Sequence, residues 1–147
     1  MTRIIALKAE DFEEWLPLWR GYQTFYKVDI DEATTRTTFA RLTGGAEPMG
    51  AFLARDDAGK AIGMVHWIMH RSCWTTGDYC YLQDLFVAPD IRGGGVGRKL
   101  IDAVYDIAQK HVCSRVWWLT HETNVQAMIL YDKVATKSGF VQYVKRF

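Results

Sequence analysis

The sequence carries almost no net charge, because 18 lysine and arginine residues are matched by 17 aspartate and glutamate residues. A formal charge of +1 creates no strong field that would attract DNA or RNA, so we expect no nucleic-acid partner. Long apolar runs are also missing. No stretch approaches the roughly 20 apolar residues of a membrane span, and the first residues, MTRIIALKAED, lack the apolar run of a signal peptide. We therefore expect a soluble cytoplasmic protein with no membrane partner.

Cysteine is scarce as well. Cys73, Cys80 and Cys113 are odd in number, and no two of them have the spacing of a metal-ligand pair or a redox motif. Reduced thiols are the plain interpretation, which again favours the cytoplasm, and no metal site is expected.

Linkers, internal repeats and low-complexity segments are absent from the sequence. Its 147 residues have the size of one domain, and a chain of this length can bury a substantial core without disulfides or metals. We expect a single domain over residues 1–147.

The spacing of apolar residues predicts a mixture of strands and helices. Short apolar or β-branched segments predict strands over residues 2–7, 51–55, 60–73, 79–87, 115–120 and 140–147. Apolar residues at three- or four-residue intervals predict helices over residues 10–26, 31–42, 97–112 and 124–138. Pro17 should kink the first helix or shift its start, and Asp31 should cap the second. Two turns join the three central strands into an antiparallel meander, so the fold class is α/β.

A glycine-rich loop follows the third strand of this meander and opens the next helix. The strand reads Tyr-Leu-Gln-Asp-Leu-Phe-Val over residues 81–87, and the loop reads Arg-Gly-Gly-Gly-Val-Gly over residues 92–97. The first amide N–H groups of a helix have no partner within it and carry partial positive charge. Glycines remove the side chains that would keep a phosphate away, so the loop predicts a pyrophosphate cradle. Its residues are Arg92, Gly93, Gly94, Gly95, Val96, Gly97 and Arg98, with the two arginines adding charge-assisted hydrogen bonds.

Two common phosphate-binding loops do not fit this stretch. No Gly-Lys-Ser or Gly-Lys-Thr follows the glycines, so it is not a Walker A loop. A dinucleotide fingerprint counted from Gly93 needs glycine where Arg98 stands, and one counted from Gly95 needs glycine where Leu100 stands.

The pattern Arg-x-x-Gly-x-Gly between a strand and a helix resembles the coenzyme A loop of the GNAT superfamily of N-acetyltransferases, and the resemblance extends along the chain in element order. It implies a mixed, twisted central sheet of six or seven strands with about four helices, and acetyl-CoA as the cofactor. In that family the strand before the loop splays from its neighbour and binds the pantetheine arm through backbone groups. Those groups would belong here to Leu85, Phe86 and Val87, with a backbone N–H near Phe86 or Val87 polarising the thioester carbonyl.

The family's next helix begins near an asparagine and carries a tyrosine seven residues later, a spacing that Asn124 and Tyr131 share. The resemblance implies that Asn124 helps to hold the cofactor and that Tyr131 protonates the leaving thiolate. A phenol with a pKa of about 10 can give a proton to a thiolate whose pKa is about 8.5. Purely structural readings also exist, with Asn124 as a helix cap and Tyr131 as a core residue.

The segment around residues 78–87 is similar to one branch of the family, which contains diamine and spermidine acetyltransferases and small yeast-type histone acetyltransferases. That branch usually has Glu-Asp where this chain has Gln83 and Asp84. Gln83 cannot accept a proton, so Asp84 is the first candidate for the general base. His66 or His70 and a chain of water molecules are the other candidates, and Asp84 also has a purely structural reading as a buried carboxylate.

The family places acceptor specificity in the first two helices and their connection. Aromatic residues beside carboxylates suit a cationic amine, so the predicted substrate-binding residues are Tyr22, Phe25, Tyr26, Gln83 and Asp84. The resemblance implies acetyl transfer to the primary amine of a small molecule, by direct attack in a ternary complex, and a homodimer. A protein or histone lysine acetyltransferase and a non-catalytic CoA-binding module remain as alternatives.

Overall fold

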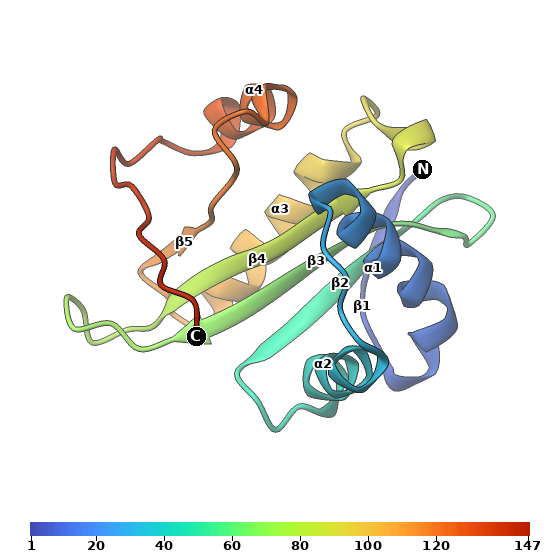
Figure 1. The fold of residues 1–147 in the computed structure, drawn as a ribbon, viewed down its shortest axis with the longest axis horizontal. Helices are drawn as coiled ribbons and strands as arrows, with labels where there is room; N and C mark the ends of the chain where they lie inside the picture. Colours follow the sequence, from blue (N-terminus) through green and yellow to red (C-terminus); the bar gives the residue numbers. More distant parts are fainter.

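A computed structural model describes residues 1–147. Its centre is a five-stranded sheet in the order β1-β2-β3-β4-β5 (Figure 1). The strands are β1 (Arg3–Ala6), β2 (Met49–Arg55), β3 (Ala61–His70), β4 (Tyr79–Val87) and β5 (Arg115–Trp117). The first four strands pair antiparallel, which confirms the central meander, and β5 pairs parallel to β4.

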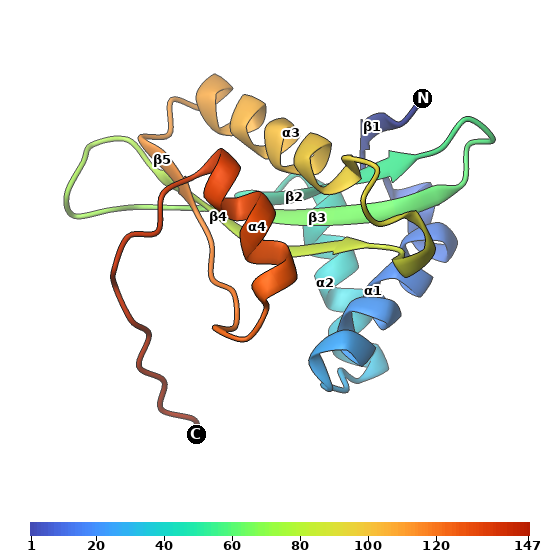
Figure 2. The ribbon, with the colours of Figure 1, turned by 90° about the horizontal axis from the view of Figure 1, so that it is seen from above.

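Helices cover both faces of the sheet (Figure 2). They are α1 (Phe12–Tyr26), α2 (Glu32–Gly44), α3 (Val96–Lys110) and α4 (Val125–Val134), with short 3₁₀ turns η1 (Ala9–Asp11) and η2 (Pro89–Ile91). The first two helices pack on one face, and α3 packs on the other. The mixed sheet and the four α-helices agree with the expected α/β architecture.

Local sequence signals set the ends of the first two helices. The Asp31 side chain accepts a hydrogen bond from the Thr34 backbone N–H at 2.6 Å, and this contact lowers the pKa of the Asp31 carboxyl. The predicted N-cap of α2 is therefore confirmed. α1 begins at Phe12 and passes through Pro17 without ending, so the expected shift of its start is wrong.

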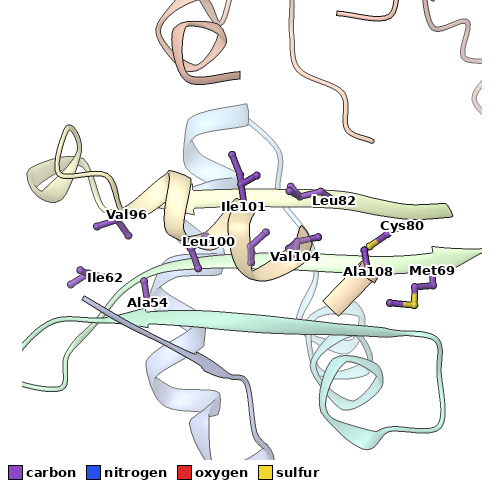
Figure 3. Close-up of a cluster of buried hydrophobic side chains, with 11 residues drawn as sticks. Ala54, Ile62, Met69, Cys80, Leu82, Val96, Leu100, Ile101, Val104 and Ala108 are labelled. Carbon is purple, nitrogen blue, oxygen red and sulfur yellow. The ribbon is translucent and has the colours of Figure 1, made fainter. Parts of the chain in front are cut away.

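Two apolar clusters separate the faces of the sheet. The cluster under α3 is shown in Figure 3, where side chains of that helix point toward those of the central strands. The second cluster fills the space between the sheet, α1 and α2, and includes Trp15, Met64 and Phe86. A Cβ atom at Gly21 would lie 2.8 Å from the Phe86 ring, so glycine is what allows α1 to approach β4 this closely.

Two predictions about the sheet are wrong. These are the strand over residues 140–147 and the total of six or seven strands. Residues 135–147 form no regular structure, the sheet has five strands, and α4 ends at Val134 rather than at residue 138. A strand forms only where a neighbour accepts its backbone hydrogen bonds, and β5 offers a ladder of just three residues. The helix stops where the apolar stripe stops, because Ala-Thr-Lys-Ser over residues 135–138 gives it no face to bury.

We expect Leu100→Ala to lower the free energy of unfolding by about 2–5 kcal/mol, because the Leu100 side chain is fully buried between α3 and the sheet and its removal leaves a cavity. Denaturant unfolding followed by circular dichroism measures this change. Asp102→Ala, at an exposed position of the same helix, is the matched control and should change the stability by less than about 0.5 kcal/mol. Equal losses in both variants would contradict the assigned core.

Candidate active site

The two strands β4 and β5 separate after three residue pairs. Tyr79, Cys80 and Tyr81 pair with Arg115, Val116 and Trp117, and β4 then continues to Val87 without a partner on that side. The separation begins at a β-bulge. His66 lies opposite Asp84 and Trp67 lies opposite Leu82, which leaves Gln83 exposed and unpaired with β3. A bulge bends its strand and increases the local twist, so the opening follows from this extra residue.

Backbone groups line the opening. The Ala88 N–H donates to the Ile62 carbonyl at 2.9 Å, toward β3. Since successive residues of a strand point their backbone groups to opposite sides, Phe86 also pairs toward β3 while Leu85 and Val87 face the gap. Of the two N–H groups expected to polarise a carbonyl, that of Val87 is directed into the opening and that of Phe86 is not.

The glycine loop has the geometry of an anion cradle. Gly93 and Gly95 have φ angles of 92° and 79°, in the left-handed region that favours glycine. Lys99 is the first residue of α3 whose backbone N–H is bonded, to the Gly95 carbonyl at 3.1 Å, and none of the amides of residues 93–98 donates to a backbone oxygen. A row of free amides at the start of a fifteen-residue helix fits a pyrophosphate.

Arg92 also makes contacts within the protein. Its Nε donates to the Val87 carbonyl at 3.1 Å, and its guanidinium lies 5.4 Å from the centre of the Phe25 ring and 5.5 Å from that of Phe86. The side chain therefore ties the loop to the end of β4 and to α1. Arg98 is exposed near the start of α3, and the terminal nitrogens of Arg92 have no hydrogen-bond partner, so both arginines can still reach a phosphate.

Asp84 is buried, with 8% of its surface exposed, and lies on the face of the sheet that α1 covers. Its Oδ2 is 2.9 Å from Nδ1 of His66, and Nε2 of His66 accepts a hydrogen bond of 2.9 Å from the Trp15 indole. Both ring nitrogens of His66 are therefore occupied, and it has no free position from which to accept a proton from a substrate.

His70 is engaged in the same way. Its Nδ1 lies 2.8 Å from the Arg71 carbonyl, and its Nε2 accepts from the Trp117 indole at 2.9 Å. The structure therefore offers neither histidine as a base, and Asp84 is the carboxylate at the opening.

Three tyrosines surround the Asp84 carboxylate. Burial raises the pKa of Tyr22, Tyr26 and Tyr81, and the Asp84 charge raises each of them further. The three phenols therefore stay protonated, and their rings form an aromatic wall around one negative charge. Phe25 extends this wall at the surface, where 47% of it is exposed. Such a site attracts a cation both by charge and through the aromatic faces.

Sequence reasoning missed Tyr81. Simple alternation along β4 places residues 81 and 84 on opposite faces, whereas the bulge at Gln83 uses one residue and returns Asp84 to the face of Tyr81. No local sequence signal marks that bulge.

Helix α4 borders the other side of the opening. The Tyr131 ring packs edge-on against Trp118, with ring centres 5.4 Å apart. Burial and the neighbouring Tyr26 raise the pKa of Tyr131 to about 12. The Asn124 amide donates to the Thr120 hydroxyl at 3.1 Å. It also hydrogen-bonds the Tyr26 phenol, which offsets a small part of the rise that burial causes in the pKa of Tyr26. The structure thus brings Tyr131 and Asn124 from α4 to Tyr26 from α1.

The acetyltransferase (GNAT) family model matches residues 9–135, and the chain belongs to this family. It is an acetyl-CoA-dependent N-acetyltransferase. The free amides of the glycine loop and the backbone groups in the β4–β5 opening fit the pyrophosphate and the pantetheine arm of that cofactor.

Two curated relatives are similar to this chain. It is 38% identical over 139 residues to the D-amino-acid N-acetyltransferase HPA3 of Saccharomyces cerevisiae, covering 94% of this chain and 86% of that protein. It is also 38% identical over 132 residues to the thialysine N-epsilon-acetyltransferase of Bos taurus, covering 90% of this chain and 63% of the bovine protein. These relatives agree with the branch indicated by residues 78–87.

Solved structures share the fold. The ribosomal-protein-alanine N-acetyltransferase of Brucella melitensis biovar Abortus 2308 superposes with a TM-score of 0.83 at 23% identity, covering 100% of both chains. The aminoglycoside N-acetyltransferase AAC(6')-Iy, in complex with CoA, superposes with a TM-score of 0.85 at 17% identity, covering 99% of this chain and 95% of that one.

We expect Gly95→Ala to weaken CoA binding by about 5- to 30-fold, since a left-handed backbone costs an L-residue roughly 1–2 kcal/mol and the loop must shift to relieve it. Isothermal titration with CoA measures the change. Gly59→Ala is the matched control, because Gly59 has a φ of 84° and open space around it but lies in the β2–β3 turn. An unchanged affinity in Gly95→Ala would remove the cradle from the cofactor site.

Proposed function

We propose that the chain acetylates the primary amine of a small molecule, with Asp84 as the general base and Tyr131 as the general acid. The observation that carries this proposal is the buried Asp84 carboxylate within a ring of tyrosines, at the mouth of the β4–β5 opening and across from α4. Relatives that are named for D-amino acids and thialysine support a small amine of the amino-acid type as the first acceptor to test.

The acceptor arrives as an ammonium ion, because an alkyl amine has a pKa of about 10. Asp84 attracts this cation, and the rings of Tyr22 and Tyr26 pack against it. The carboxylate then takes one ammonium proton, which leaves a nucleophilic amine in the opening. Gln83, exposed at the bulge, can orient the amine or a water molecule but cannot accept the proton.

Acetyl-CoA supplies the acetyl thioester. The Val87 and Leu85 N–H groups face the gap and can donate to an oxyanion that develops there. Burial raises the pKa of Tyr131 to about 12, so the phenol is protonated at physiological pH and has a proton to give as charge develops on the leaving sulfur. The loop from Arg92 to Arg98 and Asn124 hold the cofactor, and proximity of the two reactants supplies much of the rate.

Thiol release from acetyl-CoA tests this function, with D- and L-amino acids, thialysine, polyamines, aminoglycosides and lysine peptides as acceptors. We expect turnover with a small amine well above the rate without acceptor. Turnover with lysine peptides alone would replace the small-molecule assignment by a protein acetyltransferase.

Tyr131→Phe separates an enzyme from a CoA-binding module in the same assay. Removing the hydroxyl should lower kcat by roughly 10²–10⁴-fold, the usual contribution of a general acid, and leave the CoA affinity unchanged. In the native protein the high pKa of Tyr131 predicts no loss of kcat on the alkaline side up to about pH 10. Absence of turnover with every acceptor, together with tight CoA binding, would favour the non-catalytic module.

We also propose a homodimer that covers the C-terminal segment, residues 135–147. This segment exposes most of the surface of its large apolar side chains, which are Phe140, Val141, Tyr143, Val144 and Phe147. Exposed apolar side chains gathered on one segment without regular structure favour burial against a partner.

Light scattering during gel filtration should give twice the monomer mass at micromolar concentration. Tyr143→Glu should shift the mass toward the monomer, because a charge would enter the apolar contact. A monomer mass for the unaltered chain would count against the dimer.

No helix of the structure combines the length and the apolar character that a membrane crossing requires. Cys73, Cys80 and Cys113 all carry free thiols. Free thiols support the proposed cytoplasmic location, where the reducing pool maintains them.

A further inference from the structure

Three elements contribute to one buried hydrogen-bond chain that ends at the active-site carboxylate. Trp15 of α1 donates through Nε1 to Nε2 of His66 on β3, and Nδ1 of His66 contacts Oδ2 of Asp84 on β4, each over 2.9 Å. The exposed fractions are 0% for Trp15, 2% for His66 and 8% for Asp84. Solvent therefore reaches only the carboxylate end of this chain.

The direction of each hydrogen bond follows from the chemistry of the indole. An indole N–H is a donor only, so Nε2 of His66 must present its lone pair and carry no proton. A ring with one proton then carries it on Nδ1 and donates it to Asp84, which accepts as a carboxylate. A second proton on Nε2 would place two N–H groups against each other in a site closed to water. The indole thus selects the tautomer of His66.

The other groups that face this chain are uncharged. The Trp19 ring lies 5.1 Å from the His66 ring, and the phenols of Tyr22, Tyr26 and Tyr81 surround Asp84. No lysine or arginine lies within ion-pair distance of Asp84, whose one partner of this kind is His66. As the tautomer with its proton on Nδ1, His66 donates to Asp84 without adding a positive charge.

This arrangement differs from a catalytic triad, in which the histidine turns its second nitrogen toward the substrate. Here the second nitrogen points inward to a tryptophan, so no proton can pass through the ring to the cleft. The histidine orients the Asp84 carboxylate through Oδ2, and the Tyr22 phenol also donates a hydrogen bond to this carboxylate.

We propose that His66, held by the Trp15 indole as the tautomer with its proton on Nδ1, is the positioning residue that orients the Asp84 carboxylate toward the acceptor amine. A neutral donor fixes the carboxylate without supplying a positive charge. An imidazolium in the same place would form an ion pair with Asp84, compete with the ammonium of the acceptor and make the carboxylate a weaker base. The inference rests on the proposed role of Asp84 as the base.

Nitrogen NMR of the histidine-labelled protein without ligands tests the lock directly. We expect the His66 ring to carry its proton on Nδ1 and to leave Nε2 unprotonated at about pH 8. A ring with a proton on Nε2 at that pH would overturn the inference whatever the activity of the enzyme.

Trp15→Phe removes the lock while keeping an aromatic ring in the cluster. Nε2 of His66 then loses its donor and can gain a proton, so kcat/KM should fall by about 10-fold at about pH 6 and recover at about pH 9. Trp19→Phe is the matched control, because Trp19 is a neighbouring, buried tryptophan of the same helix whose Nε1 has no hydrogen-bond partner. It should lack the loss that is specific to low pH.

A loss of equal size at both pH values in Trp15→Phe would show a packing role alone and overturn the inference. Asp84→Asn tests the proposed base separately. If that variant keeps its activity, the base assignment fails, while the NMR result still decides whether the Trp15–His66 lock exists.

Discussion

The loss of backbone pairing between β4 and β5 is the constraint on which the site depends. The ladder ends at Tyr81 and Trp117, and the bulge at Gln83 bends β4 immediately afterwards. From that point Leu85 and Val87 have no neighbouring strand on one side, and their backbone N–H groups are available to a ligand. The same residues are fixed on their other side by β3, so the opening has one rigid wall. Unpaired backbone groups along a strand can form hydrogen bonds with an extended molecule that lies beside them.

The aromatic rings around Asp84 are held in place by packing rather than by backbone pairing. Aromatic rings of α1 contact one another in succession from Trp15 through Trp19 and Tyr22 to Tyr26, with centres 4.8–5.8 Å apart. This row of rings begins at Trp15 in the core beneath the sheet and ends at Tyr26, near Asp84. Rings in contact have few rotamers open to them, so the groups around Asp84 are held in place before a ligand arrives. Arg92 links the glycine loop to these rings, because its guanidinium packs on Phe25 and its Nε donates to the Val87 carbonyl.

Features that depend on neighbouring residues were predictable from the sequence. The glycine loop, the Asp31 cap and the meander each follow from residues within a few positions of one another, and the structure contains all three. The failures involve distant partners. The strand over residues 140–147 has a strand-like composition, but composition cannot show that no ladder lies beside it. Tyr81 was missed because the bulge is fixed by packing against β3. The histidines appeared free in the sequence because the indoles that occupy them come from Trp15, 51 positions away, and from Trp117, 47 positions away.

Helix α4 contains no fully buried residue, and one hydrogen bond, from the Tyr105 hydroxyl to the Val134 carbonyl, ties its end to α3. The remaining attachment is the packing of Leu130, Tyr131 and Val134 against the cluster under α3. Segments with so little burial open at a small fraction of the free energy of global unfolding. Tyr131, the proposed proton donor, therefore belongs to a weakly attached helix, while Asp84, the proposed base, belongs to the buried part of the sheet. Within the proposed function, such a division lets CoA leave by a local movement of one helix while the residues around Asp84 stay in place.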